Sequence, residues 1–192
     1  MKVVEMFASV QGEGLFLGTP VVFIRLAGCN LNCPFCDTEW KEGTEMTIND
    51  IHEELKKYPQ IKIVVITGGE PTIHQGFETL CKNLHLWGYQ INIETNGTSQ
   101  ITHKHVDWIT CSPKAVANYD CRAEADEIKL VVTPEFDIED PRIKALAIFH
   151  TTIWLQPEGS QMQEMWKKCN DIALKDPHYR VGVQLHKLME VR

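Results

Sequence analysis

Residues 21–38 read V-V-F-I-R-L-A-G-C-N-L-N-C-P-F-C-D-T, an apolar run followed by three closely spaced cysteines. The run 21–26 is rich in β-branched residues and has the length of a buried strand. Cys29, Cys33 and Cys36 follow it with the spacing C-x-x-x-C-x-x-C. Three thiolates are one fewer than a closed tetrahedral zinc site or a fully ligated iron–sulfur cube needs. The stretch therefore predicts a strand that leads into a metal site with one free coordination position.

The cysteine spacing leaves three kinds of site open. The first is an iron–sulfur cluster that keeps one iron free for a substrate or cofactor, and we favour it. The second is zinc completed by His52 or His74, although zinc sites more often show two C-x-x-C pairs. The third is a redox-active pair of Cys33 and Cys36, which would leave Cys29 unexplained. Disulfides are disfavoured because seven cysteines is an odd number and the sequence shows no secretory segment. The other cysteines are predicted to be small buried side chains: Cys81, Cys111, Cys121 and Cys169.

Length and composition indicate one globular domain over residues 1–192. Hydrophobic residues make up 43% of the chain and charged residues 23%, which is ordinary for a globular protein. The formal net charge of −7 argues against nucleic-acid binding, which usually needs a basic face. No secretory signal is apparent, and no stretch approaches the roughly 20 apolar residues that span a bilayer. We therefore expect a cytoplasmic protein with no nucleic-acid or membrane partner.

Short β-branched runs alternate with amphipathic helical patterns along the chain. The pattern predicts strands at residues 21–26, 61–67, 90–94, 106–110, 127–132, 151–155 and 180–185, and helices at 48–58, 77–87, 137–147 and 161–174. Such alternation is typical of a mainly parallel sheet with helical crossovers. The strands are too few for a closed eight-stranded barrel. We therefore predict an α/β fold, a partial, open (β/α)6-type barrel with mainly parallel strands.

Polar or glycine-containing motifs stand just after the predicted strands. They are the cysteine loop, Gly68-Gly69-Glu70-Pro71, Glu94-Thr95-Asn96-Gly97-Thr98, Ser112-Pro113-Lys114, Gln156-Pro157-Glu158-Gly159 and His186-Lys187. In a parallel sheet, the loops at the carboxyl ends of the strands share one face, and ligands bind there. Residues far apart in sequence are therefore predicted to form a single site.

Taken together, these motifs resemble the radical S-adenosylmethionine (SAM) superfamily. Within it the sequence is similar to the 7-carboxy-7-deazaguanine synthases. The matching motifs span nearly the whole chain: Ser9-Val10-Gln11-Gly12-Glu13-Gly14, Phe23-Ile24-Arg25-Leu26, Cys36-Asp37-Thr38, residues 65–71, residues 93–98, Ser112-Pro113-Lys114 and Gln184-Leu185-His186-Lys187. Cysteine spacing alone is specific only to the superfamily, whereas the combination of Q-G-E-G, C-D-T and E-T-N-G-T is far more selective. The resemblance implies the open barrel of a radical SAM enzyme.

The resemblance also implies a reaction. Cys29, Cys33 and Cys36 would hold a [4Fe–4S] cluster whose unique iron is chelated by SAM. One electron would cleave SAM to methionine and a 5′-deoxyadenosyl radical, which takes a hydrogen from 6-carboxy-5,6,7,8-tetrahydropterin. The pterin ring would then contract to 7-carboxy-7-deazaguanine with loss of ammonia, a step of queuosine and 7-deazapurine biosynthesis. Mg²⁺ would assist, with Thr38 as its protein ligand, and no further catalytic side chain is expected.

Two further sets of residues are carried over from the resemblance. The residues expected to contact SAM are Gly69, Ser112, Pro113, Lys114 and Gln156. The residues expected to bind the pterin are Gln11, Gly12, Glu13, Arg25 and Thr67.

Arg25 can also be interpreted from its position alone, because a guanidinium on an apolar strand needs an anion nearby. The anion could be Glu94 or the carboxylate of a substrate, and we favour the substrate. Gln11 and Glu13 carry the donors and acceptors that could read an aminopyrimidine ring.

Partners and rival functions complete the prediction. We expect a flavodoxin or a ferredoxin-like protein as electron donor, and a homodimer. The nearest enzymatic alternative is a radical SAM activase that installs a glycyl radical on a protein partner, and it should lack the Q-G-E-G loop and the C-D-T hydroxyl. The non-enzymatic alternative is a zinc-stabilised interaction module, which would be colourless and would not bind SAM.

Overall fold

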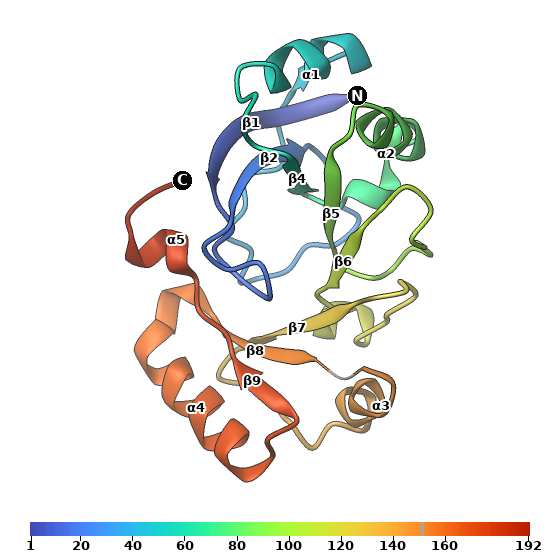
Figure 1. Cartoon of the computed structure of the whole chain (residues 1–192). Coiled ribbons are helices and arrows are strands. Elements are labelled where there is room, and N and C mark those ends of the chain that lie inside the picture. Colours follow the sequence, from blue (N-terminus) through green and yellow to red (C-terminus); the bar gives the residue numbers. More distant parts are fainter. Residues whose placement is uncertain (151) are drawn as a thin grey trace.

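The computed structural model describes residues 1–150 and 152–192, and these form a curved nine-stranded sheet with helices α1 to α4 outside it (Figure 1). The strands are β1 (Lys2–Val10), β2 (Pro20–Leu26), β3 (Thr44–Glu45), β4 (Ile63–Gly68), β5 (Gln90–Thr95), β6 (Trp108–Cys111), β7 (Glu127–Val132), β8 (Ile153–Pro157) and β9 (Tyr179–Val181). The helices are α1 (Ile48–Leu55), α2 (Phe77–Leu86), α3 (Pro141–Phe149), α4 (Met162–Lys175) and α5 (Leu185–Leu188), with short 3-10 turns at Pro71–Ile73, Ala115–Ala117 and Gly159–Gln161.

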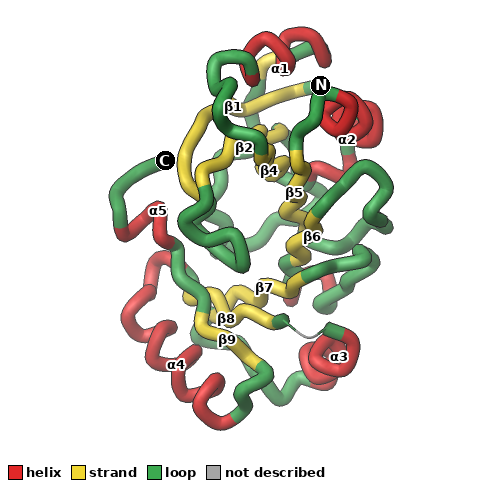
Figure 2. The backbone as a smooth tube through the Cα atoms, in the orientation of Figure 1, coloured by secondary structure: helices red, strands yellow, loops and turns green. Residues whose placement is uncertain are grey.

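The strand order is that of a partial, open barrel. It runs β3-β1-β2-β4-β5-β6-β7-β8-β9, and every pair from β2 to β9 is parallel. Figure 2 shows these strands curving around an open centre while the larger helices cover the outside. The predicted open α/β barrel with mainly parallel strands is therefore confirmed.

Two strands, β1 and β3, were not predicted. β1 pairs antiparallel with β2 and, at its start, with the two-residue strand β3. Val3 and Phe7 are its buried residues, and intermediate exposure elsewhere gives β1 a weaker pattern than the parallel strands have. The chain end returns to this strand, because the guanidinium of Arg192 pairs with Glu5 and its backbone carbonyl accepts a hydrogen bond from Ser9. The C-terminal segment thus lies against β1 at the open side of the barrel.

Most predicted elements shift by three residues or fewer at either end, and two differ by more. The helix expected over 137–147 begins at Pro141, because the Asp140 side chain accepts a 2.8 Å hydrogen bond from the Arg142 N–H and so caps it. The strand expected over 180–185 stops at Val181, and α5 follows. Residue 151, the first of the strand expected over 151–155, lies outside the described residues.

Alternation along the strands divides the sheet into two chemically different faces. On β2, Val22 and Ile24 belong to the main apolar core, which packs against the helices. The other face carries Val21 and Phe23, which form a second small cluster, and then Arg25. Successive strand residues point to opposite faces, so Arg25 lies on the inner side of the barrel.

The same alternation recurs on the neighbouring strands. The outer residues are apolar and buried: Ile66 on β4, Ile93 on β5, Ile109 on β6, Leu130 on β7 and Leu155 on β8. The adjacent inner positions are polar: Thr67, Glu94, Thr110, Lys129 and Gln156. The fold therefore has a dry core under the helices and a polar interior. Among the described residues, no helix is long and apolar enough to cross a membrane.

Helix α2 offers a matched test of the outer core. Leu84 is fully buried, whereas Leu86 on the same helix is 69% exposed. We predict that Leu84→Ala lowers the free energy of unfolding by about 2–5 kcal/mol, because it removes buried methyl groups and leaves a cavity. Leu86→Ala should change it by less than about 0.5 kcal/mol. Chemical denaturation of both variants measures the difference, and equal losses would contradict this assignment of the core.

Candidate active site

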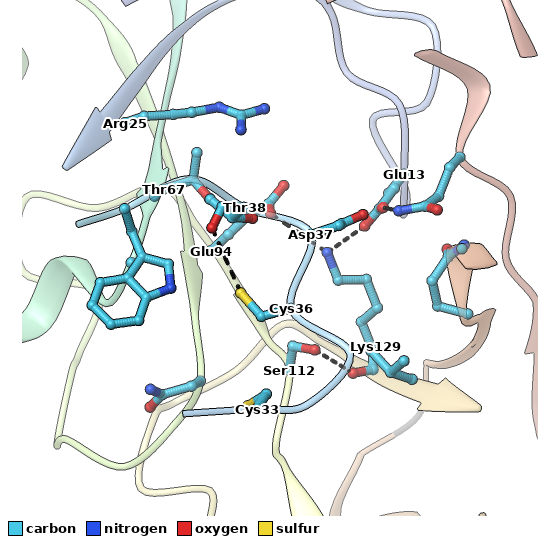
Figure 3. Close-up of a pocket in the computed structure, with 18 of the residues that line it drawn as sticks. Glu13, Arg25, Cys33, Cys36, Asp37, Thr38, Thr67, Glu94, Ser112 and Lys129 are labelled. Carbon is cyan, nitrogen blue, oxygen red and sulfur yellow. Dashed lines mark hydrogen bonds and ion pairs between the residues drawn. The ribbon is translucent and has the colours of Figure 1, made fainter. Parts of the chain in front are cut away.

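A cavity of about 320 Å³ lies inside the barrel at the carboxyl ends of the parallel strands. Its walls combine inner residues of β2, β4, β5, β7 and β8 with the cysteine loop and the C-terminal segment. Figure 3 shows Arg25 and Glu13 on opposite sides of this space, with Cys33 and Cys36 below them. The motifs that follow the strands are thus brought together, as the sequence predicts.

All three motif cysteines line the cavity. They lie on the loop between β2 and β3, where the Cys36 N–H donates to the Cys33 carbonyl at 3.2 Å and the Leu31 N–H lies 3.4 Å from the Cys29 sulfur. Burial raises the pKa of the Cys29 and Cys33 thiols, and the neighbouring thiolates add to the rise. Cys29 and Cys33 are therefore partly shielded from water at the cavity wall, whereas Cys36 is exposed.

The described residues do not form a single-ion site with these cysteines. In residues 1–150 and 152–192, no three His, Cys, Asp or Glu side chains lie close enough together to hold one metal ion. Each ligand of a four-iron cluster bonds a different iron, so its sulfurs need not converge on one point. His52 stacks on Trp87 on the helical side with ring centroids 3.9 Å apart, so it does not complete a zinc site with these cysteines.

Two glycines hold the loop after β4 against the start of the cysteine loop. The Gly69 N–H donates to the Leu26 carbonyl at 2.9 Å, and the Glu70 N–H donates to the Gly28 carbonyl at 2.8 Å. A Cβ at Gly69 would lie 1.8 Å from the Gly28 oxygen, so a side chain cannot be accommodated without moving the backbone. Gly69 itself lines the cavity.

Glu70 is a fully buried carboxylate that joins loops. It accepts hydrogen bonds from the Thr72 hydroxyl at 2.6 Å, the Thr95 hydroxyl at 2.7 Å and the Asn96 N–H at 2.6 Å. Asn96 in turn donates to Asn30 in the cysteine loop at 2.9 Å. Glu70 therefore caps neighbouring backbone and fixes the loops after β4 and β5.

The residues expected to contact SAM divide into two groups. Ser112, Lys114 and Gln156 line the cavity with Gly69, whereas Pro113 is buried outside its lining. The Ser112 hydroxyl donates to the Lys129 carbonyl at 2.8 Å, and Lys114 donates to Ser112. The Gln156 Oε1 atom is buried and has no hydrogen-bond partner among the described residues.

The residues expected to bind the pterin also divide. Gln11, Glu13, Arg25 and Thr67 line the cavity, but Gly12 does not. The Gly12 carbonyl accepts a 2.9 Å hydrogen bond from the Leu185 N–H, and a Cβ at Gly12 would lie 2.0 Å from the His186 ring. Gly12 therefore lets the C-terminal segment approach and is a neighbour of the cavity.

Arg25 lies in a part of the cavity wall that holds two guanidinium groups and one carboxylate. Its Nε lies 3.4 Å from a Glu5 carboxylate oxygen, and its guanidinium lies 5.5 Å from the centre of the Phe7 ring. Arg192 also pairs with Glu5 and lies 5.2 Å from the same ring. Two guanidiniums thus share one carboxylate, and the Arg25 Nε is buried without a hydrogen bond. Glu94, the internal partner considered from the sequence, does not pair with Arg25 and bonds elsewhere.

The opposite wall contains a buried charge network. Lys129 donates to Glu13 and also, at 3.4 Å, to Glu94, while Gln11 donates to the other Glu94 oxygen at 2.9 Å (Figure 3). Gln184 donates to Glu13 at 2.7 Å. Although burial alone would raise it, the pKa of Glu13 is lowered because Lys129 and Gln184 stabilise the charged form. Glu13 is therefore a carboxylate held in its ionised state.

Thr38 lines the cavity next to Asp37, whose side chain is paired with the C-terminal segment. Asp37, its neighbour, forms an ion pair with Lys187 of α5. The Thr38 carbonyl lies 3.8 Å from the Cys36 sulfur. The C-terminal helix is therefore tied to the segment that follows the cysteines.

Lys129, His186 and Lys187 all line the cavity. Lys129 was not predicted from the sequence, whereas the His186-Lys187 motif was predicted at this face without an individual role for either residue. Lys129 carried the same signal as Arg25, a charged side chain on an otherwise apolar strand, and could have been found. His186 and Lys187 lie on a short helix whose position depends on contacts with Gly12 and Asp37, which the sequence alone does not reveal.

Comparisons with known proteins agree with this geometry. Residues 23–128 match the model of the radical SAM superfamily. A 7-carboxy-7-deazaguanine synthase of Bacteroides thetaiotaomicron is 39% identical over 192 residues, covering all of this chain and 98% of that protein. That of Aquifex aeolicus is 38% identical over 98% of this chain and 93% of its own length. The crystal structure of QueE from Escherichia coli superposes with a TM-score of 0.73 at 29% identity, covering 96% of this chain and 94% of that one. The chain therefore belongs to the radical SAM superfamily and, within it, to the 7-carboxy-7-deazaguanine synthase family.

Proposed function

We propose that this chain is the lyase that converts 6-carboxy-5,6,7,8-tetrahydropterin to 7-carboxy-7-deazaguanine with loss of ammonia. The observation that carries the proposal is the cavity itself. On one side, the guanidinium of Arg25 is suited to bind a carboxylate. On the other side, the ionised carboxylate of Glu13 is suited to accept hydrogen bonds from N–H donors. The cysteine loop completes the same space. A pterin that carries a carboxylate has both matching ends.

The family uses a [4Fe–4S] cluster and SAM, and the cavity offers residues to hold both. Cys29, Cys33 and Cys36 are the proposed cluster ligands. Together, cluster and SAM supply a carbon radical able to remove a hydrogen atom from the substrate. This chemistry requires a site in which the radical meets only the pterin, and the buried inner faces of the strands provide it.

Four residues are proposed to hold SAM: Gly69, Ser112, Lys114 and Gln156. Gly69 gives a backbone surface without a side chain, and the Gln156 amide lines the same cavity. Lys114 and Ser112 can bind hydroxyl or carboxylate groups. Pro113, behind the wall, is proposed to fix the backbone between them.

Substrate orientation follows from the two walls. Arg25 is proposed to bind the pterin carboxylate, because a guanidinium fork matches a carboxylate and Arg25 lines the cavity. At the aminopyrimidine ring, the Gln11 amide is proposed to donate or accept hydrogen bonds and the ionised Glu13 to accept them. Thr67 is proposed to contact the pterin between the two walls. This places the reacting part of the pterin above the cysteine loop.

We also propose a magnesium ligand, an electron donor, an oligomeric state and a location. Thr38 offers a hydroxyl at the cavity for Mg²⁺, which accepts one protein oxygen when substrate and water supply the others. A flavodoxin or ferredoxin-like electron donor, a homodimer and a cytoplasmic location are proposed with them. All seven cysteines are free thiols, which suits a reducing compartment.

The central prediction concerns turnover. The anaerobically reconstituted protein, supplied with reductant, SAM and the carboxytetrahydropterin, should form 7-carboxy-7-deazaguanine. Arg25→Met should raise KM for the pterin roughly 10- to 100-fold, because a charge-assisted hydrogen bond is lost. Arg122→Met, at an exposed pair with Asp120, is the matched control and should behave as wild type. Liquid chromatography of the product measures both, and an intact cluster without product would refute the proposed substrate.

The cluster assignment has a separate test. Cys33→Ala should abolish the brown colour and the reductive cleavage of SAM, because one iron loses its ligand. Cys169→Ala, at a buried cysteine in α4, should retain both. Iron analysis and visible absorption of the reconstituted variants give the answer. Full iron content and SAM cleavage in Cys33→Ala would overturn the ligand set.

Magnesium gives a third test. Wild-type turnover should increase when Mg²⁺ is added to chelator-treated protein. Thr38→Val should lose that increase and Thr38→Ser should keep it, because only a hydroxyl oxygen can bind the ion. Initial rates measured across a magnesium series distinguish the variants. An unchanged magnesium response in Thr38→Val would exclude this ligand.

A further inference from the structure

Lys129 occupies an unusual place in the cavity. It lies on the inner face of β7, and its side chain is only 10% exposed. Its ammonium contacts two carboxylates from separate segments, Glu13 from the loop after β1 and Glu94 from β5 (Figure 3). A buried cation between two anions is costly to desolvate, so it needs a functional or structural reason.

The Glu13 carboxylate is only partly used by the protein. Its Oε2 accepts from Lys129 and its Oε1 accepts from Gln184 at 2.7 Å. An ionised carboxylate has about four lone-pair sites, so each oxygen keeps one acceptor position. Two free acceptor positions side by side match two neighbouring N–H donors, as an aminopyrimidine edge presents.

We propose that Lys129 is a positioning residue that keeps Glu13 ionised and oriented so that both oxygens accept hydrogen bonds from the aminopyrimidine edge of the pterin. The inference rests on the proposed function and deepens it, because it explains how the cavity recognises the pterin ring. Lys129 acts through Glu13 and is not itself assigned a contact with the substrate.

The charges around Glu13 support this role. The groups that face it from neighbouring elements are Lys129 of β7, Glu94 of β5, Lys114 after β6 and His186 of α5. Burial lowers the pKa of both Lys114 and His186, which weakens them as cations. Burial likewise acts to lower the pKa of Lys129, but Glu13 and Glu94 raise it overall, so Lys129 stays charged.

Removal of Lys129 should change the protonation of Glu13. Burial and the nearby Glu94 would then be opposed only by Lys114 and His186, which burial weakens as cations, so the pKa of Glu13 would rise. A protonated carboxyl group becomes a donor at one oxygen and no longer matches two N–H groups. Ligand binding in such a variant should therefore weaken as pH falls, whereas wild-type binding should not.

The test measures ligand binding by calorimetry on the reconstituted protein between about pH 5.5 and 8.5. The probes are 7-carboxy-7-deazaguanine and 7-deazaguanine, which share the aminopyrimidine edge and differ in the carboxylate. The variants are Lys129→Met, Lys129→Arg, Glu13→Gln and the double variant Lys129→Met/Glu13→Gln. Lys168→Met is the control, because that ammonium bonds the carbonyls of Thr133 and Pro134 away from the cavity.

In Lys129→Met, both probes should bind roughly 10- to 100-fold more weakly at pH 7, with a further loss approaching tenfold per unit as pH falls. Lys129→Arg should restore the flat profile, and Lys168→Met should match wild type. The double variant should show no acid limb, because Glu13 no longer titrates. A flat, wild-type profile in folded Lys129→Met would overturn the inference alone. A wild type that binds neither probe would overturn the proposed function and the inference with it.

If Lys129→Met does not fold, infrared spectra of the wild-type protein, in which Lys129 is present, test the same inference. The carboxylate infrared band that disappears in Glu13→Gln should persist in the wild type throughout the pH range. Conversion of that band to the protonated form near neutral pH would refute the role of Lys129.

Discussion

Side-chain alternation along the parallel strands is the constraint on which the rest of the structure depends. Each strand must place one set of residues under the helices and the next set inside the barrel. On β2 this separates Ile24 from Arg25, and on β7 it separates Leu130 from Lys129. A shift of one residue in any strand would bury a charge under the helices and empty the cavity wall. Core and site are therefore specified by the same register.

The position of each strand end then decides what the cavity can hold. Parallel pairing brings Arg25 beside Thr67 and Glu94 beside Thr110, so polar side chains from different strands meet at one level. Gly69 allows the next loop to lie directly on the Gly28 carbonyl, and Glu70 joins this loop to that after β5. The cysteine loop is consequently held by backbone contacts with the loop after β4 as well as by the hydrogen bond within its own turn.

The sequence predicted the parallel barrel because its strands are strongly apolar and separated by clear helical patterns. It also located most of the cavity residues, since polar motifs at strand ends must share one face. It failed where position depends on contacts between distant segments. Gly12 was expected to bind the substrate, but it lies beside the cavity and leaves room for the His186 ring, and β1 was missed because its burial pattern is weak. Arg25 was expected to pair with an anion, yet the identity of Glu5 could not be read before β1 was placed next to β2.

The electrostatics of the cavity argue that its charges are there for recognition. A buried ion pair is often no more stabilising than apolar residues of similar size, so Lys129 between Glu13 and Glu94 is weak evidence of stability. What the arrangement does provide is separation of charge across a small space. Cationic groups at Arg25 and Arg192 face an anionic acceptor at Glu13, within a chain whose net charge is −7. We expect a ligand with a carboxylate at one end and N–H donors at the other to bind in one orientation, because reversal would place like charges together and leave both walls unpaired.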